Sequence, residues 1–175
     1  SQLVRQTTDP KEKEDLQIIN RNAQYLLSLV NQMIDLRKID TQNLTLNYSQ
    51  FNFSKFLNTT ITDFSNLMKE RNISFEKIYR LKSDHIYSDK ENLHKILFNL
   101  LSNAIKHTPD KGKITLHANQ FIDKSNKLMQ FISVTNSGSI IAPDEIDKIF
   151  NRFYRIPEQN KYTNYGQSST GIGLH

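Results

Sequence analysis

Two asparagines in the second half of this sequence, Asn99 and Asn103, are spaced so that they could act together. Residues four positions apart in an α-helix lie one turn from each other on the same face. Lys106 adds a cation to that face. Amide oxygens can bind a hard cation such as Mg²⁺, usually together with phosphate oxygens and water. Two asparagines alone are more often a solvated polar face, so the surrounding motifs must decide.

The residues around this pair predict the helix that would position it. Apolar side chains recur at steps of three and four residues, which is typical of an amphipathic helix with one face in a core. Asp89 stands at the N-cap position, and Pro109 and Gly112 end the pattern. The residues expected to face the core are Leu93, Ile96, Leu97, Leu100, Leu101, Ala104 and Ile105.

Four motifs together resemble those of one protein family. The stretch NLLSNAIKHTPDKG at 99–112 resembles the N box of sensor histidine kinases, and VTNSGSII at 134–141 resembles their G1 box. IFNRFYR at 149–155 and TGIGL at 170–174 are similar to the F and G2 boxes. One such motif is a weak signal, but four in the family's order are a strong one. The resemblance implies a domain that binds ATP for phosphoryl transfer to a histidine.

This resemblance assigns the metal and the adenine to residues of the first motif. It implies that Asn103 binds the Mg²⁺ that bridges the ATP phosphates, with Asn99 close to the same ion. Lys106 would place a cation near the phosphates, and His107 stands where the family often has an aromatic residue over the adenine. An exposed lysine and a surface histidine are the alternative interpretations of these two residues.

The later motifs are expected to complete the phosphate site. By resemblance, either Arg152 or Arg155 reaches toward the γ-phosphate, and the sequence does not indicate which. Gly171 and Gly173 would let the backbone approach the phosphates at a helix N-terminus, where amide groups and the helix dipole favour anions.

The G1-like motif departs from the family at two positions. Asn136 replaces the Asp that accepts a hydrogen bond from the adenine amine, and Ile140 replaces the second glycine, which leaves Gly138. A neutral amide accepts a weaker bond than a carboxylate, so the sequence alone predicts that Asn136→Asp tightens ATP binding roughly tenfold. These departures keep open a non-enzyme alternative, a degenerate nucleotide-binding or dimerisation module. An ordinary turn is the other interpretation of the Asn-Ser-Gly tripeptide.

The residue at position 99 separates two classes of enzyme. In the related gyrase, chaperone and MutL ATPases, a Glu stands four residues before the equivalent of Asn103 and activates water. Asn99 has no basic oxygen that could take a proton. The sequence therefore favours phosphoryl transfer to a protein side chain over ATP hydrolysis.

The first 40 residues predict one long helix. Asp9 as N-cap and Pro10 at the first helical position begin it, and we expect it to run to about Ile39. By resemblance, residues 1–40 are the second helix of the dimerisation and phosphotransfer hairpin, which forms a homodimeric four-helix bundle; packing on the chain's own globular domain is the alternative. The apolar seam that needs a partner consists of Leu16, Ile19, Ala23, Leu26, Val30 and Met33, widened by Leu27 and Ile34.

The phospho-acceptor of the family is missing from this sequence. None of its five histidines is followed, on a helix, by the acidic neighbour that accompanies the family's acceptor. The resemblance places the acceptor before Ser1 and further strands beyond His175. We therefore expect that this fragment alone does not phosphorylate itself.

Residues 44–175 are expected to form the catalytic ATP-binding domain. The predicted fold is α+β, a Bergerat-type ATP-binding sandwich with a mixed sheet on helices. Strands are expected at 44–51, 73–78, 85–88, 113–122 and 129–135, and helices at 54–71 and 143–154, the latter with Ile146, Ile149, Phe150 and Phe153 inward.

Composition bounds the partners and the compartment. The 175 residues carry a net charge of +5 and no cysteine. Basic and acidic residues are interleaved, so no nucleic acid is expected as a partner. Neither a run of 18 apolar residues nor a secretory signal is found in the sequence. The resemblance implies the cytoplasmic portion of an inner-membrane sensor, with the receiver domain of a response regulator as its partner.

Overall fold

The chain divides into two units, Ser1–Thr45 and Leu46–His175, and each is described by itself. The computed structural model describes residues 10–41, 44–138, 140–152 and 154–156.

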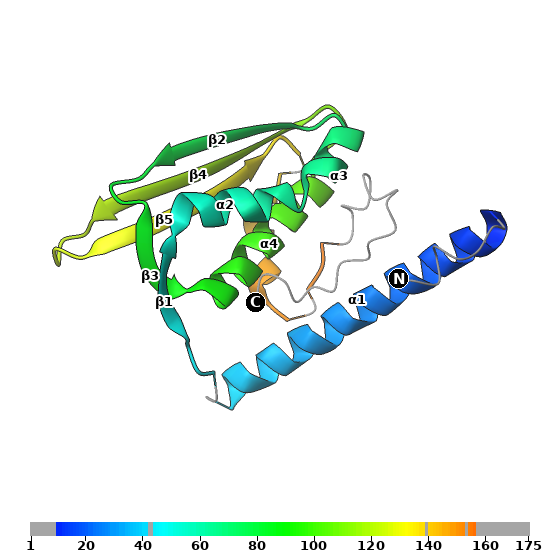
Figure 1. Cartoon of the computed structure of the whole chain (residues 1–175), viewed down its shortest axis with the longest axis horizontal. Helices are drawn as coiled ribbons and strands as arrows, with labels where there is room; N and C mark the ends of the chain where they lie inside the picture. Colours follow the sequence, from blue (N-terminus) through cyan, green and yellow to red (C-terminus); the bar gives the residue numbers. More distant parts are fainter. Residues whose placement is uncertain (1–9, 42–43, 139, 153, 157–175) are drawn as a thin grey trace. The chain divides into compact units, whose positions relative to one another are not determined.

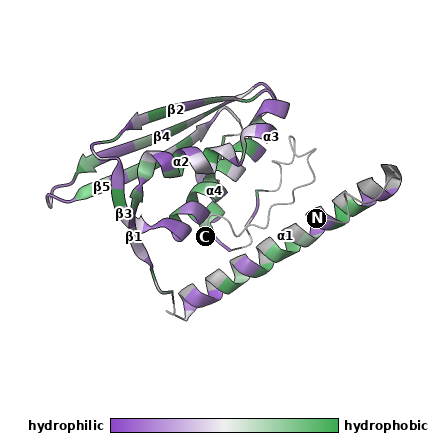
Figure 2. Ribbon diagram, in the orientation of Figure 1, coloured by the Kyte–Doolittle hydropathy of each residue, from purple (hydrophilic) through white to green (hydrophobic). Residues whose placement is uncertain are grey.

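The first unit is one long helix, α1 (Pro10–Asp40), of 31 residues. The helix has nearly the bounds that the sequence predicts. Apolar residues are distributed along it among polar ones (Figure 2). Several of its large apolar side chains are exposed: Ile18, Ile19, Leu26, Leu27, Val30, Met33 and Ile34. A helix with an exposed apolar seam needs another element to cover it.

The second unit is built on a three-stranded mixed sheet. Its strands are β2 (Ser74–Arg80), β4 (Lys113–Ile122) and β5 (Leu128–Asn136), in the order β2-β4-β5. β4 lies in the centre, parallel to β2 and antiparallel to β5. The two antiparallel strands form a hairpin, whereas the parallel pair requires a crossover that contains α4, the helix of the two asparagines.

Three helices cover one face of this sheet (Figure 1). They are α2 (Phe53–Thr62), α3 (Ser65–Glu70) and α4 (Lys90–Lys106). The core lies between them and the sheet, where alternate residues of β4 point inward. Its fully buried members include Phe53, Leu57, Leu97, Leu101, Ile114 and Leu116. This arrangement is the α+β sandwich that the sequence predicts.

A two-stranded ribbon precedes α4. β1 (Tyr48–Asn52) pairs antiparallel with β3 (His85–Asp89), so that Tyr48 is the partner of Asp89. The Asp89 carboxylate accepts from the backbone N–H of Asn92 at 2.9 Å and of Asn47 at 2.8 Å. These bonds, that from Asn92 foremost, hold the pKa of Asp89 below its ordinary value. Asp89 therefore caps α4, as predicted, and also ties the helix to β1.

Two predicted elements differ in the structure. The single helix expected over 54–71 is interrupted after Thr62, and Phe64 turns into the core with 8% of its surface exposed. The hydroxyl groups of Thr59 and Thr62 bond back to carbonyls four residues earlier, and Ser65 bonds to Thr62. Such local bonds compete with regular helix. The first predicted strand also begins later, at Tyr48.

The helix expected over 143–154 is wrong. The segment contains two 3₁₀ turns, Pro143–Glu145 and Lys148–Phe150. Ile146 and Phe150 are exposed, because turns of three residues present no continuous apolar face. The Glu145 side chain binds Lys148 at 2.9 Å and accepts from the Tyr154 hydroxyl, which holds the segment together. The prediction for Phe153 lies outside the described residues.

Candidate functional site

α4 holds its two asparagines at the edge between core and solvent. Leu97 and Leu101 are fully buried on the opposite side of the helix. Asn99 and Asn103 are consequently half-buried. Within the described part of the chain, neither side-chain amide forms a hydrogen bond with the protein. Among the described residues, no group of the protein competes with an external ligand for their oxygens. Ile96, which was expected to face the core, is exposed on this same side of the helix, so that prediction is wrong.

The C-terminal end of α4 brings a cation and a neutral imidazole to this edge. Burial lowers the pKa of Lys106, and the nearby positive charge of Arg155 lowers it further. Burial also lowers the pKa of His107, with a smaller contribution from Lys106. Two cations close together, the half-buried Lys106 and the exposed Arg155, favour the binding of an anion. A histidine with a lowered pKa is neutral near pH 7, which leaves its ring suited to stack on a base.

The end of β5 is fastened against the end of α4. The Asn136 side-chain N–H (Nδ2) donates to the carbonyl oxygen of His107 at 3.3 Å. At Gly138 the chain approaches so closely that a Cβ atom would overlap the same carbonyl group, so only glycine fits there. Asn136 and Gly138, which the sequence assigns to the site, are thus adjacent to His107. The bond to His107 leaves the Asn136 Oδ1 atom as the acceptor of this amide.

Ser137, between these two residues, continues the sheet. Its N–H donates to the Lys113 carbonyl at 2.9 Å, and its Oγ accepts from the Lys113 N–H at 2.7 Å. Asn136 is itself the last residue of β5, paired with Ile114. Asn136 therefore ends β5, and Ser137 and Gly138 form a bend that Ser137 attaches to β4.

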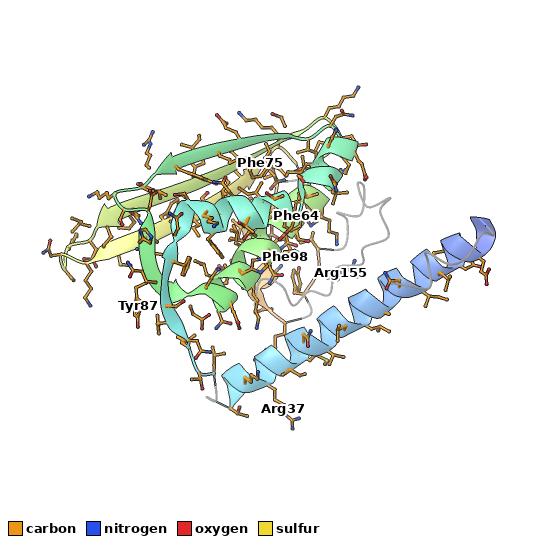
Figure 3. The ribbon with its side chains drawn as sticks, in the orientation of Figure 1. Arg37, Phe64, Phe75, Tyr87, Phe98 and Arg155 are labelled. Carbon is orange, nitrogen blue, oxygen red and sulfur yellow. The ribbon has the colours of Figure 1, made fainter. Side chains whose placement is uncertain are left out.

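The remaining predicted residues are less tightly built in. Arg152 and Arg155 are both exposed, and the electrostatic effect on Lys106 places Arg155 near the end of α4. Arg155, Phe64 and Phe98 are labelled in Figure 3; the Phe64 and Phe98 rings pack at 4.7 Å between centroids. Gly171 and Gly173 lie outside the described residues. Ile140, at the family's second glycine, has 90% of its surface exposed.

Sequence reasoning missed one buried charge beside the site. Arg71 is only 5% exposed and donates to the carbonyl oxygens of Ile105 and Thr108. In the sequence it stands among Lys69, Glu70 and Asn72, a polar run that indicates surface. Its partners are distant along the chain, so no local signal could have identified it.

The donor set of this site suits a metal only together with phosphate. Among the described residues, no group of three or more Asp, Glu, His or Cys side chains is placed to hold a metal ion. The Asn99 and Asn103 oxygens are neutral and lie beside the Lys106 cation. Mg²⁺ commonly takes one or two protein oxygens and completes its shell with phosphate oxygens and water. The residues therefore fit Mg²⁺ that arrives with a nucleotide.

The fold and this site define a class of protein. The family of histidine kinase-, DNA gyrase B- and HSP90-like ATPases matches residues 88–175, which contain all the candidate residues above. The chain belongs to this family. Among its curated relatives, histidine kinase P4 of Formosa agariphila is 35% identical over 162 residues, which is 91% of this chain and 11% of that protein. The chain spans 11% to 15% of the length of the first three curated relatives, all histidine kinases.

Solved structures of histidine kinases share the fold. Full-length ShkA in complex with AMPPNP superimposes with a TM-score of 0.72 at 22% identity, covering 97% of this chain and 33% of that one. ThkA in complex with the response regulator protein TrrA gives 0.65 at 24% identity, covering 85% and 42%. These similarities confirm the predicted α+β sandwich. In the described part of the chain, no helix is long and apolar enough to cross a membrane.

Proposed function

We propose that this chain is the ATP-binding part of a sensor histidine kinase, and that the whole protein transfers the γ-phosphoryl group of ATP to a histidine. The observation that carries the proposal is the pair of half-buried Asn99 and Asn103 amides on the helix that ends with Lys106, a cation on which the charge of Arg155 acts. Amide oxygens next to cations suit a metal-bound polyphosphate, which supplies both the negative charge and the remaining metal ligands.

The phosphate end of ATP lies along α4 in this proposal. Asn103 and Asn99 would hold a Mg²⁺ ion that arrives with the phosphates, and this ion would supply positive charge next to the phosphate oxygens. Lys106 binds the phosphates directly. Either Arg152 or Arg155 approaches the γ-phosphate, and we choose Arg155 because its charge acts on Lys106. Gly171 and Gly173 are proposed to bring backbone amides to the same phosphates.

The base lies at the opposite end of the site, where α4 meets β5. The neutral His107 ring stacks on the adenine. The Asn136 amide donates its N–H to His107, so its Oδ1 faces the adenine amine as an acceptor. Gly138 allows the chain to pass close to the His107 carbonyl. Asn136 thereby takes the role that the family gives to an aspartate.

The chemistry is positioning more than acid–base catalysis. The bond from the γ-phosphorus to the ADP oxygen breaks, and a bond to the acceptor histidine nitrogen forms. Asn99 cannot act as a base toward water, since an amide oxygen is hardly basic. A site of this kind holds ATP without hydrolysing it until a protein nucleophile is presented. The gyrase and MutL type of ATPase is therefore the weaker candidate.

One similar structure supports the proposed partner. A solved ThkA structure contains the response regulator protein TrrA, and we propose a receiver domain as the partner of the whole protein here. Residues 1–40 are proposed as a helix of the homodimeric phosphotransfer bundle and residues 44–175 as the catalytic domain. The exposed seam of α1 supports this division. The proposed location is the cytoplasmic side of a membrane-anchored sensor.

Phosphoryl transfer by the whole protein tests this function. Incubation with γ-labelled ATP and Mg²⁺ should give acid-labile, base-stable label, as expected of phosphohistidine. Asn103→Ala should abolish the label while the helix remains folded, because alanine favours helix more than asparagine does. Asn119→Ala on the outer side of β4 is the matched control and should keep full activity. Unchanged labelling of Asn103→Ala would refute the assignment.

One observation supports the non-enzyme alternative. Ile140 occupies a glycine position of the family and is 90% exposed, so the backbone there lacks glycine's freedom. A degenerate module would bind ATP weakly and leave histidine unlabelled in the same assay.

A further inference from the structure

Arg71 is a buried cation whose side chain bonds to the last turn of α4 and to the residues that follow it. Its Nη1 donates to the Ile105 carbonyl at 2.6 Å, and its Nη2 donates to the Thr108 carbonyl at 2.5 Å. Its Nε is paired with the Asp110 carboxylate at 2.8 Å. The Arg71 carbonyl also accepts from the Lys111 N–H at 3.0 Å. Four groups within seven residues are thus fixed by one side chain and its backbone.

The same segment contains His107, whose carbonyl group contacts the end of β5. The His107 carbonyl accepts from Asn136 and lies against Gly138. At Gly112, a Cβ atom would come within 2.5 Å of the Thr108 methyl group and 3.0 Å of the Ser137 Oγ. The segment is therefore packed tightly between Arg71 and residues 136–138. A displacement of the segment would move the carbonyl that orients the Asn136 amide.

The guanidinium group is well suited to fix two carbonyls at once. Its N–H groups lie in one plane at fixed angles and it keeps its charge when buried. The carbonyls at the end of α4 carry the negative end of the helix dipole, so a cation there is favourable. A lysine at this position keeps the charge, but its single ammonium group cannot reproduce the planar arrangement of donors.

We propose that Arg71 is a positioning residue of the nucleotide site, acting through His107 on Asn136. It holds the segment so that the His107 carbonyl turns the Asn136 amide with its Oδ1 toward the base. The predicted effect of Arg71 on nucleotide binding rests on the proposed function. Its predicted effect on the Asn136 amide is independent of that function. The alternative is an anchor that stabilises the fold without selective influence on the site.

The test compares Arg71→Lys with the wild-type chain in three measurements. Affinity for AMPPNP with Mg²⁺ should fall roughly tenfold, as expected for the loss of one well-placed contact. Affinity for inorganic triphosphate with Mg²⁺ should change less than about twofold, because Arg71 does not bear on the phosphate end. The side-chain amide resonances of Asn136 should shift and exchange faster with solvent, whether or not nucleotide is present.

Two further variants distinguish a positioning role from general destabilisation of the fold. The side chain of Asp110 is 68% exposed, so Asp110→Ala removes only the exposed partner of Arg71. This variant should weaken AMPPNP binding about two- to threefold. Leu57→Ala leaves a cavity in the core beneath α2 and should lower the melting temperature. It should leave the ratio of the affinities for AMPPNP and triphosphate unchanged. If Arg71→Lys does not fold, the Asp110 variant carries the test.

Three outcomes would overturn the positioning role. These are an unaltered Asn136 amide in the variants, an equal loss of affinity for AMPPNP and triphosphate, and the same selective loss in Leu57→Ala. Failure of the wild-type chain to bind either ligand would contradict the proposed function instead, and the Asn136 resonances would still decide the role of Arg71.

Discussion

Replacing Asn136 with Asp should weaken nucleotide binding, although the sequence alone favours the opposite sign. The structure shows the Asn136 N–H donating to the His107 carbonyl at 3.3 Å. A carboxylate has no such donor and would place its charge against a carbonyl oxygen. In the free protein, the carboxylate of Asn136→Asp would rotate toward water. Binding adenine would then require its return to an unfavourable position.

Two contributions set the change in binding, because the bond to His107 is lost in the free and the bound variant alike. Returning the charged acceptor to a place against the unpaired His107 carbonyl costs about 2 kcal/mol. The charge-assisted bond to the adenine amine returns about 1 kcal/mol. The net loss of about 1 kcal/mol corresponds to roughly fivefold weaker binding. The free energy of unfolding should fall by a similar amount, about 1 kcal/mol.

Calorimetric titration of AMPPNP near pH 7 measures this difference. Asn119→Asp is the control, because it adds the same charge on the outer side of β4, away from the site. It should leave the affinity within about twofold of the wild type. Tighter binding by Asn136→Asp would refute the reasoning, since it would mean that the bond to His107 does not orient this amide.

Four other predictions follow from the site. Asn103→Ala should abolish phosphoryl transfer by the whole protein, measured with labelled ATP. This chain alone should remain unlabelled under the same conditions, because none of its histidines has an acceptor's neighbours. Burial lowers the pKa of His107 in the folded chain, so as the pH falls the imidazole is protonated in the unfolded chain before it is protonated in the folded one. Stability should therefore fall as the pH drops below about 6.5, and thermal melts of His107→Gln should show less of this fall. The bonds to Asp89 lower its pKa, so it stabilises the fold above about pH 4 and loses this effect as the pH falls further; Asp89→Ala should lower the melting temperature at pH 7 more than at pH 3.

The helix of the two asparagines could be predicted because its signals are local. α4 begins after Asp89 and ends at Lys106, as the cap, the apolar period and Pro109 indicate. The hairpin of β4 and β5 was predicted for the same reason, since both strands alternate around a short turn. The sequence therefore identified both elements that border the site.

The contacts between these elements could not be predicted. Asn136 and His107 are 29 residues apart, and Arg71 is 34 to 39 residues from its partners. Such bonds depend on how the elements pack, which no local pattern encodes. The prediction of a helix over 143–154 was wrong for a related reason. The apolar residues of this segment have helical spacing, but the bonds made by Glu145 hold it as short turns.

The central claim is that this chain binds ATP through a metal held by the α4 asparagines. Titration of AMPPNP into the chain, with Mg²⁺ and with a chelator, tests it most directly. We expect chelation to weaken binding at least roughly tenfold in the wild type. Asn103→Ala should bind weakly in both conditions, because the ion and the amide act together. Equal affinity of the wild-type chain with and without Mg²⁺, or no binding at all, would contradict the claim.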